Sequence, residues 1–284
     1  MTDAATPAPA PAKAPPAGKP RRISTYRTLG EGSSFVINTV TVCALLGLWW
    51  LATELAWVRP LFLPKPSTIL FALQQSLAGE LDNNTLWVHI GWSLFRVTSA
   101  FALAALIGIP VGLAMGVNRI ARGVFDPPIE FYRPLPPLAY LPLMIIWLGI
   151  GETSKVALIF LACFAPVALA ARSGVRSVSQ EQIQAALSMG ATKAQVLRKV
   201  ILPSALPGIL VGLRIGMGVG WTTLVAAEMV AANAGLGQMV LNASNFLRTD
   251  VVILGIIIIG LFALAFELGI RQLEKALVPW KGRV

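Results

Sequence analysis

The sequence predicts an all-helical membrane protein with about six transmembrane helices, and the observations behind that fold class are its composition and its long apolar runs. Of the 284 residues, 56% are hydrophobic and only 13% are charged. Soluble domains carry roughly 25% charged residues. The mean hydropathy is +0.71. Together these values exclude an ordinary soluble domain and place the chain in the membrane class.

The first element is a tail rich in proline and alanine that covers residues 1–34. Its central stretch, TPAPAPAKAPPAGKPRR, has too few apolar side chains to form a core, so we expect it to be disordered. It is too polar for a cleaved signal peptide, and no small-residue cleavage site follows the first apolar run. The helical membrane domain is therefore expected to cover 35–283 and to retain its first span.

Six apolar segments are candidates for crossing helices, which need roughly 20 residues to span about 30 Å of hydrocarbon. They cover residues 35–53, 91–117, 135–150, 156–171, 207–231 and 251–270. Prolines crowd the third segment, so we expect it to begin with a proline-defined turn and to be kinked. Residues 66–78 are amphipathic and too polar to cross, and we expect a short helix there at the outer surface.

The distribution of basic residues orients the chain. Lysines and arginines gather in the tail, after the second and fourth spans and at the C-terminal end, while the opposite side carries only Arg59, Lys65, Lys155 and Arg248. Basic residues favour the cytoplasmic side of a membrane, so we expect both termini in the cytoplasm. Topology thereby explains the formal net charge of +10 without nucleic-acid binding.

A polar insert at 172–206 separates the fourth and fifth spans on the cytoplasmic side. Ser179 with Gln182, and then Thr192 with Gln195, have the spacing of capping boxes. Each box predicts the start of a short helix. Gly190 lies between the two helices and fits the left-handed position that ends the first one.

The faces of this insert indicate that the helix pair needs a surface to pack against. Ile183, Ala186 and Leu187 share one side of the first helix, and the second helix carries an apolar stripe that includes Val196. We expect the second helix to end near Pro203, because proline disfavours helix in the residue before it. Helices this short are marginal in water. The surface they need belongs either to the chain's own membrane domain or to a partner.

The insert also contains a recognisable motif: QAA at 184–186, Gly190 after three residues, and VILP at 200–203 after nine more. It resembles the EAA motif of ABC importer permeases, which reads Glu-Ala-Ala, three residues, Gly, nine residues, Ile-x-Leu-Pro. Gln184 replaces the usual glutamate and Val200 replaces isoleucine. The resemblance implies a type I ABC importer permease fold and makes 172–206 a cytoplasmic coupling loop. The residues it assigns to contact with a separate ATPase are Gln184, Ala185, Ala186, Gly190, Leu202 and Pro203.

Longer stretches extend the resemblance over roughly residues 35–283. RPLPPLAYLPLMIIWLGIGETSK (133–155), LPSALPGILVGLRIGMGVGWTTLVAAEMVAA (202–232) and GLGQMVLNASNFLRTDVV (235–252) resemble the nitrate/sulfonate/taurine branch of these permeases, and within it the taurine permeases most. The resemblance implies a bacterial inner-membrane subunit that passes taurine or a related sulfonate delivered by a periplasmic solute-binding protein. It also implies a second permease copy beside this one. Nitrate and other alkanesulfonates stay open as substrates.

The sequence contains no G-x-x-x-x-G-K-[ST] phosphate loop. We therefore expect no cofactor and no enzymatic activity in this chain, with ATP and magnesium bound by the partner ATPase. Its single His89, expected at the membrane interface, and its isolated Cys43 and Cys163 cannot build a metal centre or a catalytic pair. An ion-coupled secondary carrier is the alternative from another class, but it would be expected to show inverted repeats and midplane acids, which the sequence lacks.

Two glycine series recur at every fourth residue within predicted spans. They are Gly108, Gly112 and Gly116, and Gly212, Gly216 and Gly220. Such series let helices pack backbone to backbone in lipid. They are either surfaces that slide during transport or fixed packing within one subunit.

Four ionisable side chains lie within the predicted spans, where a charge costs at least about 2.5 kcal/mol and needs a partner or water. Arg96 and Glu228 lie near the outer end. Arg214 and Glu267 lie nearer the inner end, so we expect two ion pairs at matched depths. The pairs are either structural locks or, in the case of Arg96, a guanidinium offered to a sulfonate in the pathway.

Overall fold

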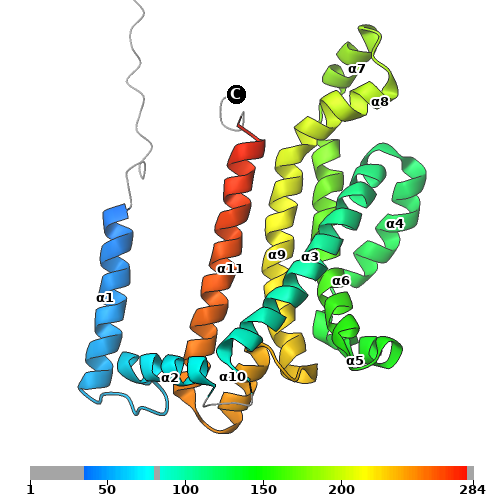
Figure 1. Cartoon of the computed structure of the whole chain (residues 1–284). Coiled ribbons are helices and arrows are strands. Elements are labelled where there is room, and N and C mark those ends of the chain that lie inside the picture. The colour runs from blue at the N-terminus through cyan, green and yellow to red at the C-terminus, as the bar shows by residue number, and fades with distance from the viewer. Residues whose placement is uncertain (1–34, 80–83, 280–284) are drawn as a thin grey trace, which may run out of the picture. The chain divides into compact units, whose positions relative to one another are not determined.

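The computed structural model describes residues 35–79 and 84–279, and every regular element within them is helical (Figure 1). The all-helical fold class is therefore confirmed for this part of the chain. Two compact units are present, Met1–Trp49 and Trp50–Val284. The tail predicted for 1–34 lies outside the described residues.

The first unit contributes most of α1 (Phe35–Glu54), a helix of 20 residues with no charge before its last residue. At 1.5 Å per residue the helix is about 30 Å long, which matches the hydrocarbon thickness of a bilayer. It is therefore long and apolar enough to be a membrane span.

The second unit carries the remaining elements. In chain order they are α2 (Pro66–Ala78), α3 (Leu86–Val117), α4 (Arg119–Tyr132), α5 (Pro137–Leu148), α6 (Glu152–Arg176), α7 (Gln180–Ser188), α8 (Lys193–Val196), the π-helical turn η1 (Leu197–Ile201), α9 (Leu202–Ala231), α10 (Leu236–Asn245) and α11 (Thr249–Leu277). The short helix predicted for 66–78 is present as α2. Helices α4 and α10 were not predicted from the sequence.

Five helical segments in the described part of the chain are long and apolar enough to cross a membrane. The sixth predicted crossing, over 135–150, is shorter than expected: α5 has 12 residues, which gives a length of only about 18 Å. Pro137 occupies the first turn, and Gly149, with a φ of +80°, follows the last residue. The proline and the glycine limit α5 to 12 residues. At that length α5 cannot cross about 30 Å of hydrocarbon unaided.

α3 packs along α6 through the first glycine series. The contacts, in chain order, are Gly108 with Val167, Gly112 with Ala168, and Gly116 with Val175. At Gly112 an added side chain would collide with a backbone carbonyl oxygen of α6, and at Gly116 an added Cβ would lie 2.5 Å from the Cβ of Val175. The glycines are therefore needed for the close approach of the two helices.

α9 packs on α6 through the second glycine series. The contacts are Gly212 with Ala170, Gly216 with Val167, and Gly220 with Cys163. The thiol of Cys163 also donates to the carbonyl oxygen of Gly216 at 3.2 Å. Both glycine series thus supply packing inside one subunit, with α6 between α3 and α9.

The structure corrects the predicted end of the second insert helix. The helical stretch continues from Lys193 through η1 and α9 to Ala231, without a break at Pro203. Pro203 lies in the first turn of α9, directly after the π-helical turn. A proline is tolerated there because the π-helical turn already interrupts the regular i→i−4 hydrogen bonds, so the missing N–H breaks no α-helical bond. Helix α8, the π-helical turn η1 and span α9 therefore form one continuous helix.

Candidate functional site

The insert at 172–206 folds as two short helices around a glycine. The hydroxyl oxygen of Ser179 accepts the backbone N–H of Gln182, and Thr192 with Gln195 forms a complete capping box. Gly190 has a φ of +82°, in the left-handed region where side chains are strained. The predicted helix–glycine–helix shape is confirmed, and Gly190 is the residue that permits the reversal.

One face of this helix pair packs against the chain's own membrane domain. Ala186 and Val196 are buried in a cluster that includes Ala205 and Ile209 of α9. Ile183 packs on the same cluster. The sequence left open whether the helix pair packs on the chain's own membrane domain or on a partner. This face packs on the membrane domain.

The other face presents apolar side chains at the turn. Met189 is 82% exposed and Leu187 is 46% exposed, and α7 and α8 extend past the adjacent ends of α6 and α9 (Figure 1). Gln184 and Ala185 are exposed beside them. Contiguous exposed apolar side chains are typical of an interaction surface. Sequence reasoning did not single out Met189, although an apolar residue directly before Gly190 was a usable signal.

Leu202 and Pro203, the last residues of the motif, lie at the start of α9 instead of at the turn. Leu202 is partly exposed and Pro203 is half-buried. The structure therefore brings Gln184, Ala185 and Gly190 to one exposed tip and places the two motif-end residues in the helix that leads from the tip into the membrane domain.

Arg96, on α3, is joined to carboxylates from two other helices. Its Nη1 donates to Oε1 of Glu228 on α9 at 2.7 Å and to the carbonyl oxygen of Ala234 at 2.7 Å. Its Nε and Nη2 donate to the carboxylate of Glu152 at the start of α6, at 2.5 and 2.8 Å. The side chains of Arg96 and Glu228 are 1% and 0% exposed. Four of the five guanidinium N–H groups are therefore engaged inside the protein.

The same carboxylate fixes the turn between α9 and α10. Ser93 donates to Oε1 of Glu228 at 2.8 Å and accepts the N–H of Leu236 at 2.8 Å. The N–H of Gly237 donates to Oε2 of Glu228 at 2.9 Å. Gly235 has a φ of +147°, and a Cβ added there would lie 2.5 Å from Oε1 of Glu228. Only glycine fits against this carboxylate.

Lys155 completes the group by donating to Glu152 at 2.8 Å. We call the set the Arg96 cluster; its members are Ser93, Arg96, Glu152, Lys155 and Glu228. Two guanidinium or ammonium charges face two carboxylates, so the cluster is neutral overall. Sequence reasoning missed Glu152 and Lys155 because they lie in the GETSK stretch at a span end, where charges are ordinarily solvated.

His89 does not lie at an exposed interface as expected. It is 1% exposed, and its Nδ1 lies 3.1 Å from the backbone N of Gly235, which donates to it. The reason is that the turn after α9 folds back onto the first turns of α3. His89 thus supports the same turn that the Arg96 cluster holds.

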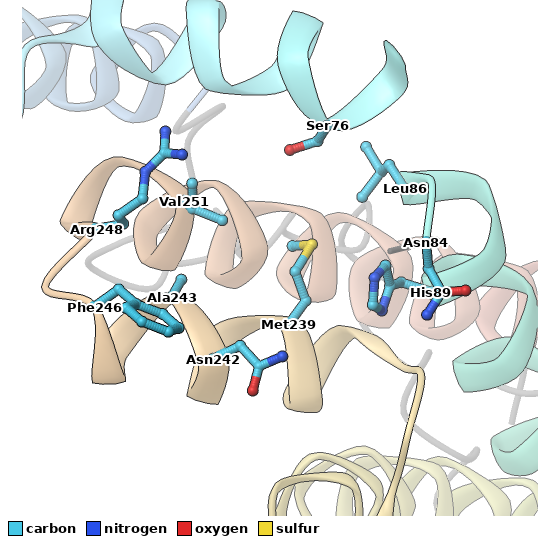
Figure 2. Close-up of a pocket in the computed structure, with 10 residues that line it drawn as sticks. All are labelled: Ser76, Asn84, Leu86, His89, Met239, Asn242, Ala243, Phe246, Arg248 and Val251. Carbon is cyan, nitrogen blue, oxygen red and sulfur yellow. The ribbon is translucent and has the colours of Figure 1, made fainter. Parts of the chain in front are cut away.

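A cavity of about 360 Å³ opens at this end, between α2, α10 and the first turns of α3 and α11. Figure 2 shows the side chains that line it: Ser76, Asn84, Leu86, His89, Met239, Asn242, Ala243, Phe246, Arg248 and Val251. The charged member of this lining is Arg248. Its Nη2 donates to Gln75 at 3.3 Å and to Asp250 at 3.0 Å, so its charge is already compensated.

A second charge cluster joins α9 and α11. Nε and Nη2 of Arg214 donate to Oε1 of Glu267 at 3.0 and 2.6 Å, and Nε of Arg271 donates to the same oxygen at 2.9 Å. Nη1 of Arg214 lies 3.8 Å from Oε2 of Glu274. We call these four residues the Arg214 cluster. Its central pair is 31% and 30% exposed, in contrast to the buried Arg96 cluster.

The structure therefore brings together both of the charge pairs that depth along the spans had suggested. Within residues 35–79 and 84–279, no three His, Cys, Asp or Glu side chains group so as to hold a metal ion.

Comparison with known proteins gives one family and a consistent set of relatives. The family model described as "Binding-protein-dependent transport system inner membrane component" matches residues 104–279. The chain is 56% identical over 266 residues to the taurine transport system permease protein TauC of Escherichia coli (strain K12), which covers 93% of this chain and 96% of that protein. It is 33% identical over 237 residues to the putative aliphatic sulfonates transport permease protein SsuC of the same organism, over 83% of this chain and 88% of that protein.

A similar fold is found in solved structures. The chain superimposes on an inward-facing form of the MetNI methionine ABC transporter with a TM-score of 0.58, covering 68% of this chain and 97% of that one at 20% sequence identity. At this identity the similarity establishes the arrangement of helices and nothing about the ligand.

Proposed function

The chain belongs to the family of binding-protein-dependent transport system inner membrane components, and from that premise we propose that it forms the membrane pathway for taurine or a closely related sulfonate. It is a multi-pass inner-membrane permease subunit of an ABC importer; such subunits are not enzymes, and the ATPase is a separate chain. The observation that carries the substrate proposal is the 56% identity to a taurine permease over nearly the whole of both chains. The resemblance noted in the sequence points to the same branch.

Other small oxyanions are the second candidate substrates. The chain is 33% identical to the aliphatic sulfonates permease SsuC of Escherichia coli. It is also 33% identical over 198 residues to the bicarbonate transport permease protein CmpB of Synechococcus elongatus, over 69% of this chain and 71% of that protein. Since these relatives share one branch but differ in substrate, membership of the branch does not identify the ligand. Nitrate and alkanesulfonates therefore belong in the substrate panel.

We place the α7 end of the subunit in the cytoplasm, together with both chain termini, on the distribution of basic residues. In this orientation the exposed tip of α7, with Leu187, Met189 and Gly190, docks on the ATPase subunit. The buried face of the same helix pair holds it to the membrane domain, so a push on the tip moves α9 as well. ATP and magnesium are bound on that partner chain.

The α10 end then faces the periplasm, where a solute-binding protein delivers the substrate. A second copy of the chain completes the pathway, since one copy exposes charged side chains of the Arg214 cluster at membrane depth. We assign Arg96 to a structural role in preference to direct contact with a sulfonate. This assignment is supported by its 1% exposure and by the engagement of its donors inside the protein.

The test is uptake by the reconstituted complex of permease, ATPase and binding protein in liposomes. We expect ATP-dependent accumulation of taurine, with weaker uptake of other alkanesulfonates and none of nitrate. Uptake of nitrate or bicarbonate in place of sulfonates would overturn the substrate assignment. Uptake of any solute by the permease without the ATPase would overturn the importer mechanism.

A further inference from the structure

Two cavities follow one another along the groove between α9 and α11, and the Arg214–Glu267 pair separates them. The first, of about 540 Å³, runs from Val225 on α9 and Ile259 on α11 to Glu267. The second, of about 460 Å³, begins at Arg214 and continues along α11 to Val278. Because the two charged side chains are in contact, they form the partition of one longer groove.

At its depth in the membrane, this ion pair must face water or other protein. Arg214 lies about 18 Å from the start of α9, and Glu267 lies about 15 Å from the end of α11. Centred on about 30 Å of hydrocarbon, α11 is about 44 Å long and overhangs by about 7 Å at each end, which places Glu267 and its partner Arg214 roughly 8 Å inside. Charges at that depth are stable only when they face a water-filled cavity or other protein. The side chains are nevertheless 31% and 30% exposed.

The pair also has unused capacity for a ligand. All three donors to Glu267 converge on Oε1, and no hydrogen bond to Oε2 is formed by the residues that the structure describes. Arg214 keeps Nη1 for a contact of 3.8 Å with Glu274 that is too long for a hydrogen bond. Oε2 of Glu267 thus has capacity for a ligand cation, and Nη1 of Arg214 is held only by the longer contact with Glu274.

The wall of the larger cavity is mostly apolar and includes Trp221, which is 4% exposed and packs edge-on against Phe266. Gly218, next to it in the lining, leaves open space where a Cβ would point.

We propose that this groove is a stretch of the transport pathway and that the Arg214–Glu267 pair is a gate that binds a small zwitterion, an aminoalkylsulfonate. Oε2 of Glu267 accepts the ammonium group, and the guanidinium of Arg214 exchanges its carboxylate for the sulfonate, whose planar face of oxygens suits the guanidinium fork. Passage then requires the pair to separate, which the substrate's own opposite charges make possible. This inference rests on the proposed function and names pathway residues that it leaves open.

The competing occupant of the groove is a lipid acyl chain, and cysteine labelling distinguishes the two. Gly218→Cys places a thiol in the groove, about 6 Å outward from the ion pair. Gly260→Cys is the matched control: it also has open space, lies about 10 Å outward, and continues the exposed apolar stripe of Leu264 and Leu268 on α11. Both are made in a Cys43→Ala background, which leaves only the buried Cys163.

The reaction with a water-soluble maleimide is measured in the permease–ATPase complex in liposomes, since only a hydrated thiol ionises and reacts. We expect Gly218→Cys to react at least about 10-fold faster than Gly260→Cys, and millimolar taurine to slow it. Equal, slow rates at both positions would show a lipid-filled groove and overturn the proposal. Fast labelling that taurine does not slow would overturn the ligand site.

Exchanging the charged residues distinguishes a pair that binds the substrate from a pair that only joins α9 to α11. The quadruple variant Arg214→Glu, Glu267→Arg, Arg271→Glu and Glu274→Arg keeps every opposite-charge contact of the Arg214 cluster but reverses the polarity along the groove. We expect complex assembly and melting temperature close to wild type, with taurine uptake reduced at least about 10-fold, the loss of one charge-assisted contact. Taurine uptake at the wild-type rate would mean that the pair only holds α9 and α11 together. If the wild-type complex takes up no taurine, the proposed function fails instead, and the labelling result still decides whether the groove is hydrated.

Discussion

The Arg96 cluster and the Arg214 cluster use the same residue types at two depths along α9, near its end at Glu228 and nearer its middle at Arg214, yet only one of them is shielded from solvent. Arg96 and Glu228 are 1% and 0% exposed, whereas Arg214 and Glu267 are 31% and 30% exposed. Around Arg96, side chains and backbone groups from α3, α6 and the α9–α10 turn satisfy nearly every donor. Around Arg214, donors converge on one carboxylate oxygen and leave the other open.

The two clusters therefore differ in whether their intramembrane charges are available for transport. A buried pair with complete hydrogen bonding is costly to break, since the remaining charge has no partner and no water. It therefore fixes helices relative to one another. A half-exposed pair can exchange partners with a ligand or water at small cost. The sequence, which places all four residues in apolar spans, does not distinguish the two cases.

Removal of the buried guanidinium tests the structural role of the Arg96 cluster most strongly. We expect Arg96→Met to lower the free energy of unfolding by about 3–5 kcal/mol, because Glu228 is left charged and buried without its partner. Chemical denaturation of the purified permease in detergent measures the change. The matched variant Arg214→Met makes the same chemical replacement at the exposed cluster. Equal losses of stability in the two variants would contradict the assigned difference.

A subtler change at the same cluster replaces Glu228 by glutamine. Both carboxylate oxygens accept hydrogen bonds, including one from the N–H of Gly237. An amide has only one acceptor oxygen, so one buried donor must face an N–H₂ group at a cost of about 1–3 kcal/mol. We expect a destabilisation of that size in the same denaturation assay. An unchanged midpoint would show that the α9–α10 turn does not depend on the carboxylate.

The coupling tip offers a variant that leaves both clusters intact. Gly190→Val puts a β-branched side chain at a φ of +82°, where the left-handed backbone costs about 1–2 kcal/mol. An added Cβ meets no neighbour there, so the effect is confined to the turn. We expect ATP hydrolysis by the complex to continue while taurine uptake falls.

The control for this variant is Gly190→Asn, because asparagine visits the left-handed region more readily than other non-glycine residues. It should retain more of the coupled uptake than the valine variant. Coupled transport at the wild-type rate in Gly190→Val would contradict the role of the turn.

Much of this arrangement was accessible from the sequence because it depends on local chemistry. The N-caps at Ser179 and Thr192 and the left-handed Gly190 are set by short-range backbone requirements and appear where the spacing predicted them, although only Thr192 with Gln195 forms a complete capping box. The end of α8 was not predictable in the same way. Proline rules would stop the helix near Pro203, but a π-helical turn places that proline where its missing N–H is not needed.

Packing between helices that are distant in sequence explains the remaining differences between the predictions and the structure. Glu152 and Lys155 lie far from Arg96 in sequence, and only the packing of α6 against α3 brings their charges into one network. His89 became buried for the same reason, since the turn after α9 covers it. The matched depths of the charged residues could suggest pairs, but no sequence pattern shows which pair is solvated.

The smallest expected effect on stability belongs to Arg214→Gln. Exposed ion pairs contribute little to folding, so we expect the melting temperature of the complex to stay within about 2 °C of wild type. Lys65→Gln is the matched control, because Lys65 pairs with Glu54 at 2.6 Å with similar exposure, 38% and 43%, outside the groove. Taurine uptake should fall at least about 10-fold in Arg214→Gln, which loses a charge-assisted contact to the sulfonate, and stay near wild type in Lys65→Gln. A marked drop in melting temperature for Arg214→Gln would instead make this pair a lock like the Arg96 cluster, because a residue whose replacement loosens the fold cannot be the freely exchanging partner that a gate requires.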